Sequence, residues 1–318
     1  MNHMIFDLLI NQRIIVMNQS ISEQLQSYDD YLILKNFSLA TRKMYLRTLK
    51  SYLRFHNSRC QHLSIGQDSA RQYILFRKKQ GKSWPTINCD YSALRKYFKN
   101  VLCIEWSLKK IPRPRQEDSL PNIISKQDVV RLINHAGNYK QQVFICFVYA
   151  TGLRLSEALN VTFEDIDRDR LQIHVHRGKG AKDRIVQIPS CLISVLTDYY
   201  KYYRPEKYLF NGLKKGSKYS NSAAQWIMRQ ARKNNKFTKK ASIHTLRHAY
   251  ATHHLESGTD LVYLKKQLGH KHLKTTERYI HLCVNRVRTI HHPIAELIPE
   301  LHWINRLETC SAITESAI

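Results

Sequence analysis

Apolar side chains recur at helical spacing between residues 22 and 108, which predicts a series of helices. The first break falls at Asn36-Phe37-Ser38, where Ser38 suits a helix N-cap. A later helix ends at Gly81, a typical C-cap signal, and Pro85 fits the first turn of the next. The pattern indicates a compact helical domain of ordinary size over residues 22–108.

A different pattern follows at residues 109–122 (KKIPRPRQEDSLPN), which are rich in proline and basic residues and lack an apolar period. Proline restricts its own φ and the conformation of the residue before it, so such a stretch favours extended chain. We expect a basic linker here, with a domain on either side. Residues 1–21 are predicted to be an N-terminal extension, in which Met17 is an alternative start.

Beyond the linker, the spacing of apolar residues is helical in some segments and strand-like in one. Ser125 and Asp128 form the pattern of a capping box, and a nearly continuous apolar segment that ends at Gly152 predicts a buried helix. Apolar residues then alternate over 171–188 around Gly178-Lys179-Gly180, which predicts a β-hairpin. Further helical segments follow. We therefore expect an α+β protein, mainly α with a small antiparallel β-sheet, whose second domain covers residues 123–290 before a tail at 291–318.

The net charge of the chain indicates what kind of partner it binds. The chain has 51 Lys+Arg against 25 Asp+Glu, a formal net charge of +26. Such an excess indicates a polyanion, with double-stranded DNA as the first choice and an anionic membrane surface as the alternative. No basic amphipathic helix supports a membrane, and the apolar segment at residues 4–17 is too short to span one. We expect a soluble cytoplasmic protein with no membrane partner.

Basic side chains on the predicted helices are the candidate DNA contacts. Tyrosine and phenylalanine are interleaved with them and form either the domain core or part of the DNA-binding surface. The seven cysteines include no CxxC pair, which indicates reduced thiols and no cysteine-based zinc site. The candidates for DNA binding are Arg42, Lys43, Arg47, Lys50, Arg95, Lys96 and Lys182.

The second domain carries residues suited to chemistry on a phosphodiester. Cleavage by a covalent route needs a nucleophile, cations for the phosphate oxygens, and an acid for the leaving oxygen. Tyr279 can attack, and Thr275 or Thr276 is a natural N-cap that would place its phenol in the first turn of a helix. The candidate set is Arg154, Lys179, His244, Arg247, His270 and Tyr279.

The order and spacing of this set resemble the tyrosine recombinase (phage integrase) family, of the Xer-like or mobile-element kind. The segments that carry the resemblance are ATGLRLSEALN at 150–160, RGKGAKDRIVQIP at 177–189, HTLRHAYATHHLESGTD at 244–260 and LGHKHLKTTERYIH at 268–281. The resemblance implies a helical core-binding (SAM-like) domain and a catalytic domain that form a C-shaped clamp on DNA. It also implies a homo-tetramer on two DNA sites with inverted-repeat cores, and neither metal nor other cofactor.

The same resemblance implies a role for each residue. Arg154 and Arg247 would hold the scissile phosphate, and Lys179 would protonate the leaving 5′ oxygen, with Lys182 as its rival. His244 would assist proton transfer at the phenol, and His270 would hydrogen-bond the phosphate. Tyr279 would form a 3′-phosphotyrosyl link, so that strands rejoin through a Holliday junction without ATP. Glu157 would support the site.

Three alternatives remain open on the sequence alone. A type IB topoisomerase shares this chemistry, and a catalytically inactive relative would only bind DNA. A histidine metal site is the third, although no HExxH or CxxC motif accompanies it. Its histidines would be His253, His254, His270, His272, His281, His291 and His292. The target DNA sequence cannot be predicted, because it depends on base contacts and DNA shape.

Overall fold

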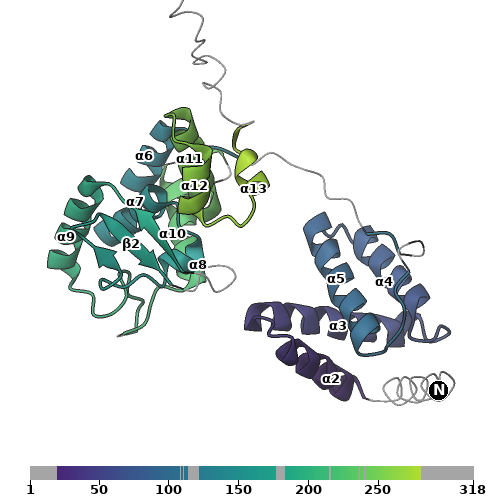
Figure 1. Ribbon diagram of the computed structural model, residues 1–318. Coiled ribbons are helices and arrows are strands. Elements are labelled where there is room, and N and C mark those ends of the chain that lie inside the picture. Colours follow the sequence, from purple (N-terminus) through teal and green to yellow (C-terminus); the bar gives the residue numbers. More distant parts are fainter. Residues whose placement is uncertain are drawn as a thin grey trace, which may run out of the picture. The chain divides into compact units, whose positions relative to one another are not determined.

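The computed structural model divides the chain into two compact units, Met1–Ser119 and Leu120–Ile318 (Figure 1). Several predicted segments lie outside the described residues: most of the N-terminal extension, much of the linker, the hairpin tip with Lys179 and Lys182, and the tail at 291–318. The described residues are 20–107, 109, 111–113, 122–176, 183–214, 216–235, 237–239 and 241–280.

The described part of the first unit consists of helices joined by short turns. Its first helix begins earlier than expected, at Ile21, because Ser20 forms a capping box with Glu23. Ser38 caps the second helix through the Thr41 amide, as predicted. The helices are α2 (Ile21–Leu34), α3 (Leu39–Arg59), α4 (Gln67–Lys79) and α5 (Trp84–Asn100).

Aromatic rings fill the core of this unit. Tyr28, Tyr52 and Tyr97 are fully enclosed, and α3 packs against both α2 and α5. The ring of Tyr28 meets that of Tyr97 edge-on at 5.4 Å between centroids. Of the two roles considered for the interleaved aromatics, these rings therefore take the core role. Ile111, which lies inside the predicted linker, is only 2% exposed and packs into the same core.

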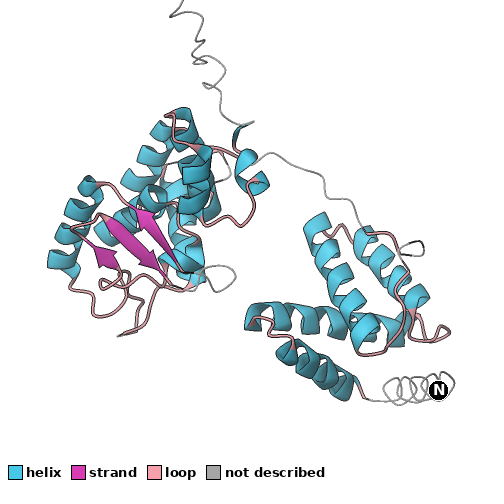
Figure 2. Ribbon diagram, viewed as in Figure 1, coloured by secondary structure: helices cyan, strands magenta, loops and turns pink. Residues whose placement is uncertain are grey.

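The second unit places helices around a small antiparallel sheet of order β1-β2-β3 (Figure 2). Strands β2 and β3 pair with Ile173 opposite Val186, which confirms the predicted hairpin. Strand β1 is only two residues long and was not predicted. The elements are α6 (Lys126–Asn134), α7 (Tyr139–Thr151), α8 (Leu155–Ala158), β1 (Ile166–Asp167), β2 (Gln172–Val175), β3 (Arg184–Gln187), α9 (Ser190–Tyr203), α10 (Asn221–Asn234), α11 (Ile243–Glu256), α12 (Leu261–Leu268) and α13 (Lys274–Glu277). The α+β prediction is confirmed.

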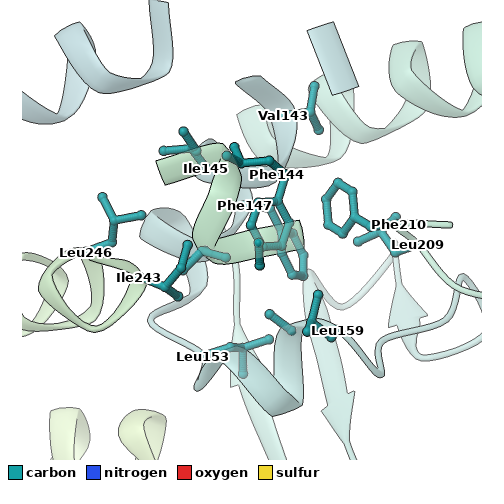
Figure 3. Close-up of a cluster of buried hydrophobic side chains, with 14 of the residues drawn as sticks. Val143, Phe144, Ile145, Phe147, Leu153, Leu159, Leu209, Phe210, Ile243 and Leu246 are labelled. Atoms are coloured by element: carbon teal, nitrogen blue, oxygen red, sulfur yellow. The ribbon is translucent and has the colours of Figure 1, made fainter. Parts of the chain in front are cut away.

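Helix α7 lies at the centre of the second unit's core. Its Phe144 and Phe147 are fully buried and meet the ring of Phe210 (Figure 3). On its other sides α7 packs against α11 and α9. The apolar segment thus forms the predicted buried helix, and its C-terminal end is fixed beside α11, where the candidate residues lie. None of the helices in the described ranges is long and apolar enough to cross a membrane.

Candidate active site

A cavity in the second unit gathers most of the predicted site residues. Arg154 comes from the start of α8, His244 and Arg247 from α11, His270 from the turn after α12, and Tyr279 from the turn after α13. Residues more than 100 positions apart in the chain thus line one hollow. Its lining also includes residues that were not predicted. The full lining is Arg154, His244, Arg247, His248, His270, Thr275, Arg278 and Tyr279.

Arg247 is held by the ends of two helices. Its Nη1 donates to the Gly152 carbonyl at the C-cap of α7, and its Nη2 donates to the Leu268 carbonyl at the end of α12, both at 2.6 Å. The last carbonyls of a helix lack intrahelical partners and carry partial negative charge, so a guanidinium satisfies them well. Burial and the nearby Arg154 lower the pKa of Arg247 to about 10. It still carries its charge at neutral pH.

Arg154 forms an ion pair with Glu157, three residues later in the chain. Its Nη1 donates to Glu157 Oε1 at 2.8 Å, and its Nη2 donates to the Gly269 carbonyl at 3.0 Å. Glu157 also accepts two hydrogen bonds from Arg184, at 2.9 and 2.8 Å. Although burial opposes its ionisation, the hydrogen bonds and charges of the two arginines lower the pKa of Glu157 to about 2.

Arg184 was missed by the sequence prediction. It opens β3 and its side chain is 12% exposed, between Glu157 and the Gln267 carbonyl, to which its Nε donates at 3.1 Å. Gln267 also accepts from the Gln187 amide at 3.0 Å, so α12 and β3 are joined twice. The available signal was a basic residue at the start of a strand that directly follows the predicted hairpin tip.

Gly269 and Gly152 allow these contacts. Both end a helix at positive φ, +62° and +60°, a region that favours glycine. A Cβ on Gly269 would lie 2.9 Å from Cδ and Nε of Arg184, and one on Gly152 would lie 2.4 Å from the ring of Tyr250. Each glycine also gives its carbonyl to an arginine of the cavity.

His270 has a defined tautomer. Its Nε2 lies 3.1 Å from Arg247 Nη2, which can only donate, so Nε2 accepts. The ring proton therefore sits on Nδ1 and points to Thr276 Oγ1 at 2.9 Å. Burial, Arg247 and Arg154 lower the pKa of His270 to about 3, so the ring is neutral. Thr276, which is fully buried, thus fixes the orientation of the imidazole.

Tyr279 lines the same cavity, and it lies just after the end of α13. The prediction that Thr275 or Thr276 caps a helix containing the phenol is wrong, because both threonines lie within α13 and Leu273 occupies its N-cap position. The Thr276 hydroxyl is bonded to His270 instead. Tyr279 follows the helix, its amide bonded to the Thr276 carbonyl at 3.0 Å. Its side chain is 4% exposed, and burial raises the pKa of the phenol.

His248, a second unpredicted residue, contacts the phenol directly. Its Nδ1 lies 2.9 Å from Tyr279 Oη. His244, which was predicted to serve the phenol, lies one helical turn earlier, lines the cavity and is exposed. Burial, Arg247 and Arg154 lower the pKa of His244. The signal for His248 was its spacing of four from His244, which places both on one face of a helix.

The predicted DNA-binding residues of the first unit differ in their surroundings. Arg42 forms a two-point ion pair with Asp29, at 2.8 and 2.6 Å. Lys96 is half-buried, with its ammonium 5.1 Å from the Phe37 ring centre. The others, Lys43, Arg47, Lys50 and Arg95, are exposed.

The predicted histidine metal alternative gains no support from the described part of the chain, where no group of three His, Cys, Asp or Glu side chains could hold an ion. His253 and His254 instead bond the hydroxyl groups of Tyr149 and Thr259, at 2.8 and 3.1 Å. His281, His291 and His292 lie outside the described residues.

Comparison with known proteins shows the family to which the chain belongs. The phage integrase family profile matches residues 122–286, and the profile of the phage integrase N-terminal SAM-like domain matches residues 25–108. The chain therefore belongs to the phage integrase family and is a tyrosine-type site-specific recombinase.

Individual relatives cover most of the chain. The putative integrase/recombinase y4qK of Sinorhizobium fredii is 32% identical over 285 residues, 89% of this chain and 89% of its own. The putative integrase/recombinase y4eF of the same organism is 32% identical over 237 residues, 74% of this chain and 94% of its own. Tyrosine recombinase XerA of Pyrococcus horikoshii is 29% identical over 220 residues, covering 69% and 77%.

Solved structures share the fold at lower identity. XerH recombinase bound to palindromic difH substrate has a TM-score of 0.65 at 20% identity, covering 84% of this chain and 82% of that one. A lambda integrase dimer bound to a COC′ core site has a TM-score of 0.66 at 15% identity, covering 81% and 76%.

Proposed function

We propose that this recombinase cleaves and rejoins DNA through a 3′-phosphotyrosyl intermediate on Tyr279. The observation that carries the proposal is the convergence of Arg154, Arg247, His270 and Tyr279 on one cavity. In transesterification the phenol replaces the 5′ oxygen on phosphorus. The phosphodiester energy is kept in the covalent link, so rejoining needs no ATP, and the two arginines supply the positive charge that a metal ion would otherwise provide.

The two arginines supply positive charge, which stabilises the negative charge that develops on the phosphate oxygens in the transition state. Arg154 and Arg247 are oriented before DNA arrives, by Glu157 and by helix-end carbonyls. Donors that are already in place stabilise a developing charge without reorganising, which is the main source of such catalysis. Guanidinium groups also match the geometry of paired phosphate oxygens.

The remaining roles follow the family resemblance. His270 bonds a phosphate oxygen. Because its free-state proton is on Nδ1, this contact requires protonation of Nε2, which the negative phosphate favours. Lys179 protonates the leaving 5′ oxygen. His244, to which the resemblance gives proton transfer at the phenol, lines the cavity and is exposed, so it can also contact the DNA backbone.

At the level of the assembly, the first unit binds duplex DNA through the exposed basic side chains of α3 and α5. Four protomers join two DNA sites with inverted-repeat cores and exchange strands through a Holliday junction. The net charge of +26 supports a DNA partner, and several solved relatives are DNA complexes.

Trapping the covalent intermediate tests the proposal. A binding site is first selected from a pool of random duplexes, and a nick is placed so that the cleaved strand loses a short fragment. The wild-type protein should then form an adduct that resists denaturation, and Tyr279→Phe should form none. An equal adduct yield from Tyr279→Phe would refute the assignment of the nucleophile. Adduct formation in excess EDTA tests the metal-free route.

A further inference from the structure

His248 lines the cavity although the sequence did not predict it, and its side chain contacts the hydroxyl of Tyr279. It follows Arg247 directly on α11, and its Nδ1 lies 2.9 Å from Tyr279 Oη. The two rings are 5.6 Å apart between centroids and inclined by 47°. This distance suits a hydrogen bond between a hydroxyl and a ring nitrogen.

We propose that His248 accepts the proton of Tyr279 during attack on the phosphate. The inference rests on the proposed function, because it requires Tyr279 as nucleophile. As the bond from Oη to phosphorus forms, the O–H bond breaks and the proton passes to Nδ1 of His248. The bond from phosphorus to the 5′ oxygen breaks at the same time, and that oxygen takes a proton from a separate donor. Rejoining reverses each transfer, so the imidazolium returns its proton to the phenol.

The surroundings of His248 keep its imidazole ring neutral. The groups facing it are His244 and Arg247 on its own helix, Arg278 and Tyr279 beyond α13, and His270 after α12. Burial, His244, Arg247 and Arg278 lower the pKa of His248 to about 4, while burial raises the pKa of Tyr279. The pair is therefore neutral before DNA binds, and a phosphate in the cavity favours the imidazolium that transfer creates.

His244 is less well placed for this task. Within its helix it stands one turn before His248, and its side chain is exposed, whereas the phenol is 4% exposed. General-base catalysis requires hydrogen-bond reach to the proton being moved, and the 2.9 Å contact gives His248 that reach.

Single-turnover rates of adduct formation, measured against pH on the nicked duplex, test the inference. His248→Ala and His248→Gln should both slow the step by roughly 10²-fold or more, the usual contribution of a general base. Their rates should rise with pH, because hydroxide must then take the phenol proton, while the wild-type rate is flat near neutrality. Glutamine can keep a hydrogen bond to the phenol but cannot accept its proton. A wild-type rate and pH profile for His248→Gln would overturn the inference.

A second substrate separates the two proton transfers. A 5′-bridging phosphorothiolate has a leaving sulfur that needs no proton, so it should restore Lys179→Ala but not His248→Ala. Rescue of His248→Ala by this substrate would place His248 on the leaving-group side and overturn the assignment. Thermal melting and DNA affinity of each variant show whether the fold is retained.

Two controls distinguish the failure of this inference from failure of the proposed function. His254→Gln, on the same helix but bonded to Thr259 and outside the cavity lining, should react at the wild-type rate. If Tyr279→Phe forms no adduct while both His248 variants react normally, only the role of His248 is refuted. If Tyr279→Phe still forms the adduct, the proposed function itself fails.

Discussion

One carboxylate, that of Glu157, holds two guanidinium groups that would otherwise repel each other. It is 6% exposed and bonds Arg154 on one side and Arg184 on the other. Removing one member of a buried ion pair leaves the opposite charge without compensation, which is far more costly than losing a surface pair. The placement of Arg154 in the cavity therefore depends on Glu157.

Glu157→Gln should lower the free energy of unfolding by about 3 kcal/mol at pH 7, the cost of breaking a buried charge pair. The pKa of Glu157 is about 2 in the folded protein, below its ordinary value of 4.5. Its stabilisation is therefore present above pH 4.5 and is lost as the pH falls toward 2. Urea unfolding of both proteins at pH 7 and pH 3 should show the difference between them shrinking in acid. A constant difference would contradict the ionised state of Glu157.

The sequence prediction selected Arg154, Arg247, His270 and Tyr279 as residue types suited to a phosphodiester, and the family resemblance gave each of them its role. It missed Arg184, since the value of that side chain depends on strand β3 lying beside α12. It also did not single out His248, because sequence spacing does not show which turn of α11 faces Tyr279. Both residues are placed by contacts between elements, and the spacing of residues in the sequence does not encode such contacts.

At the scale of the elements, the packing of α12 against β3 depends on a glycine, Gly269. Gly269 ends α12 at positive φ and leaves room for Arg184. Periodicity and capping signals were enough to predict the helices, including the capping box of Ser125 and Asp128. They failed at α13, whose N-cap is Leu273 and which has no side-chain cap.

Gly269→Ala should destabilise the protein more than Gly258→Ala. Both positions have positive φ, which costs an alanine about 1 kcal/mol. Only at Gly269 does the added Cβ also meet Arg184, whereas at Gly258 nothing lies within 4 Å. Displacing Arg184 from Glu157 should add at least about 1 kcal/mol. Midpoints of urea unfolding measure both variants, and equal losses would show that Arg184 moves aside freely.

Across the whole molecule, positive charge dominates, with 51 Lys+Arg and 25 Asp+Glu. Composition could predict the class of partner, because counterion release depends on charge and not on detailed structure. It could not predict which basic side chains remain available. In the first unit Arg42 is engaged by Asp29, while Arg47 on the same helix is exposed.

Arg47→Ala should weaken DNA binding and reduce its salt dependence. Each phosphate contact that is lost lowers the slope of log K against log salt by about 0.9. Arg47→Lys keeps the charge and should keep the slope, which makes it the matched control. Fluorescence anisotropy between low and moderate salt measures both. If Arg47→Ala leaves the slope unchanged, Arg47 does not contact the DNA backbone.

The carbonyl groups that orient Arg247 have a consequence for how this protein can change over time. They belong to Gly152 and Leu268, and every amino acid carries the same carbonyl group. Mutation at position 268 replaces a side chain but leaves the acceptor where it was, provided that α12 still ends there. The orientation of Arg247 therefore depends on the path of the backbone and not on the side chain at position 268. The sequence around the cavity can then diverge while the cavity keeps its geometry.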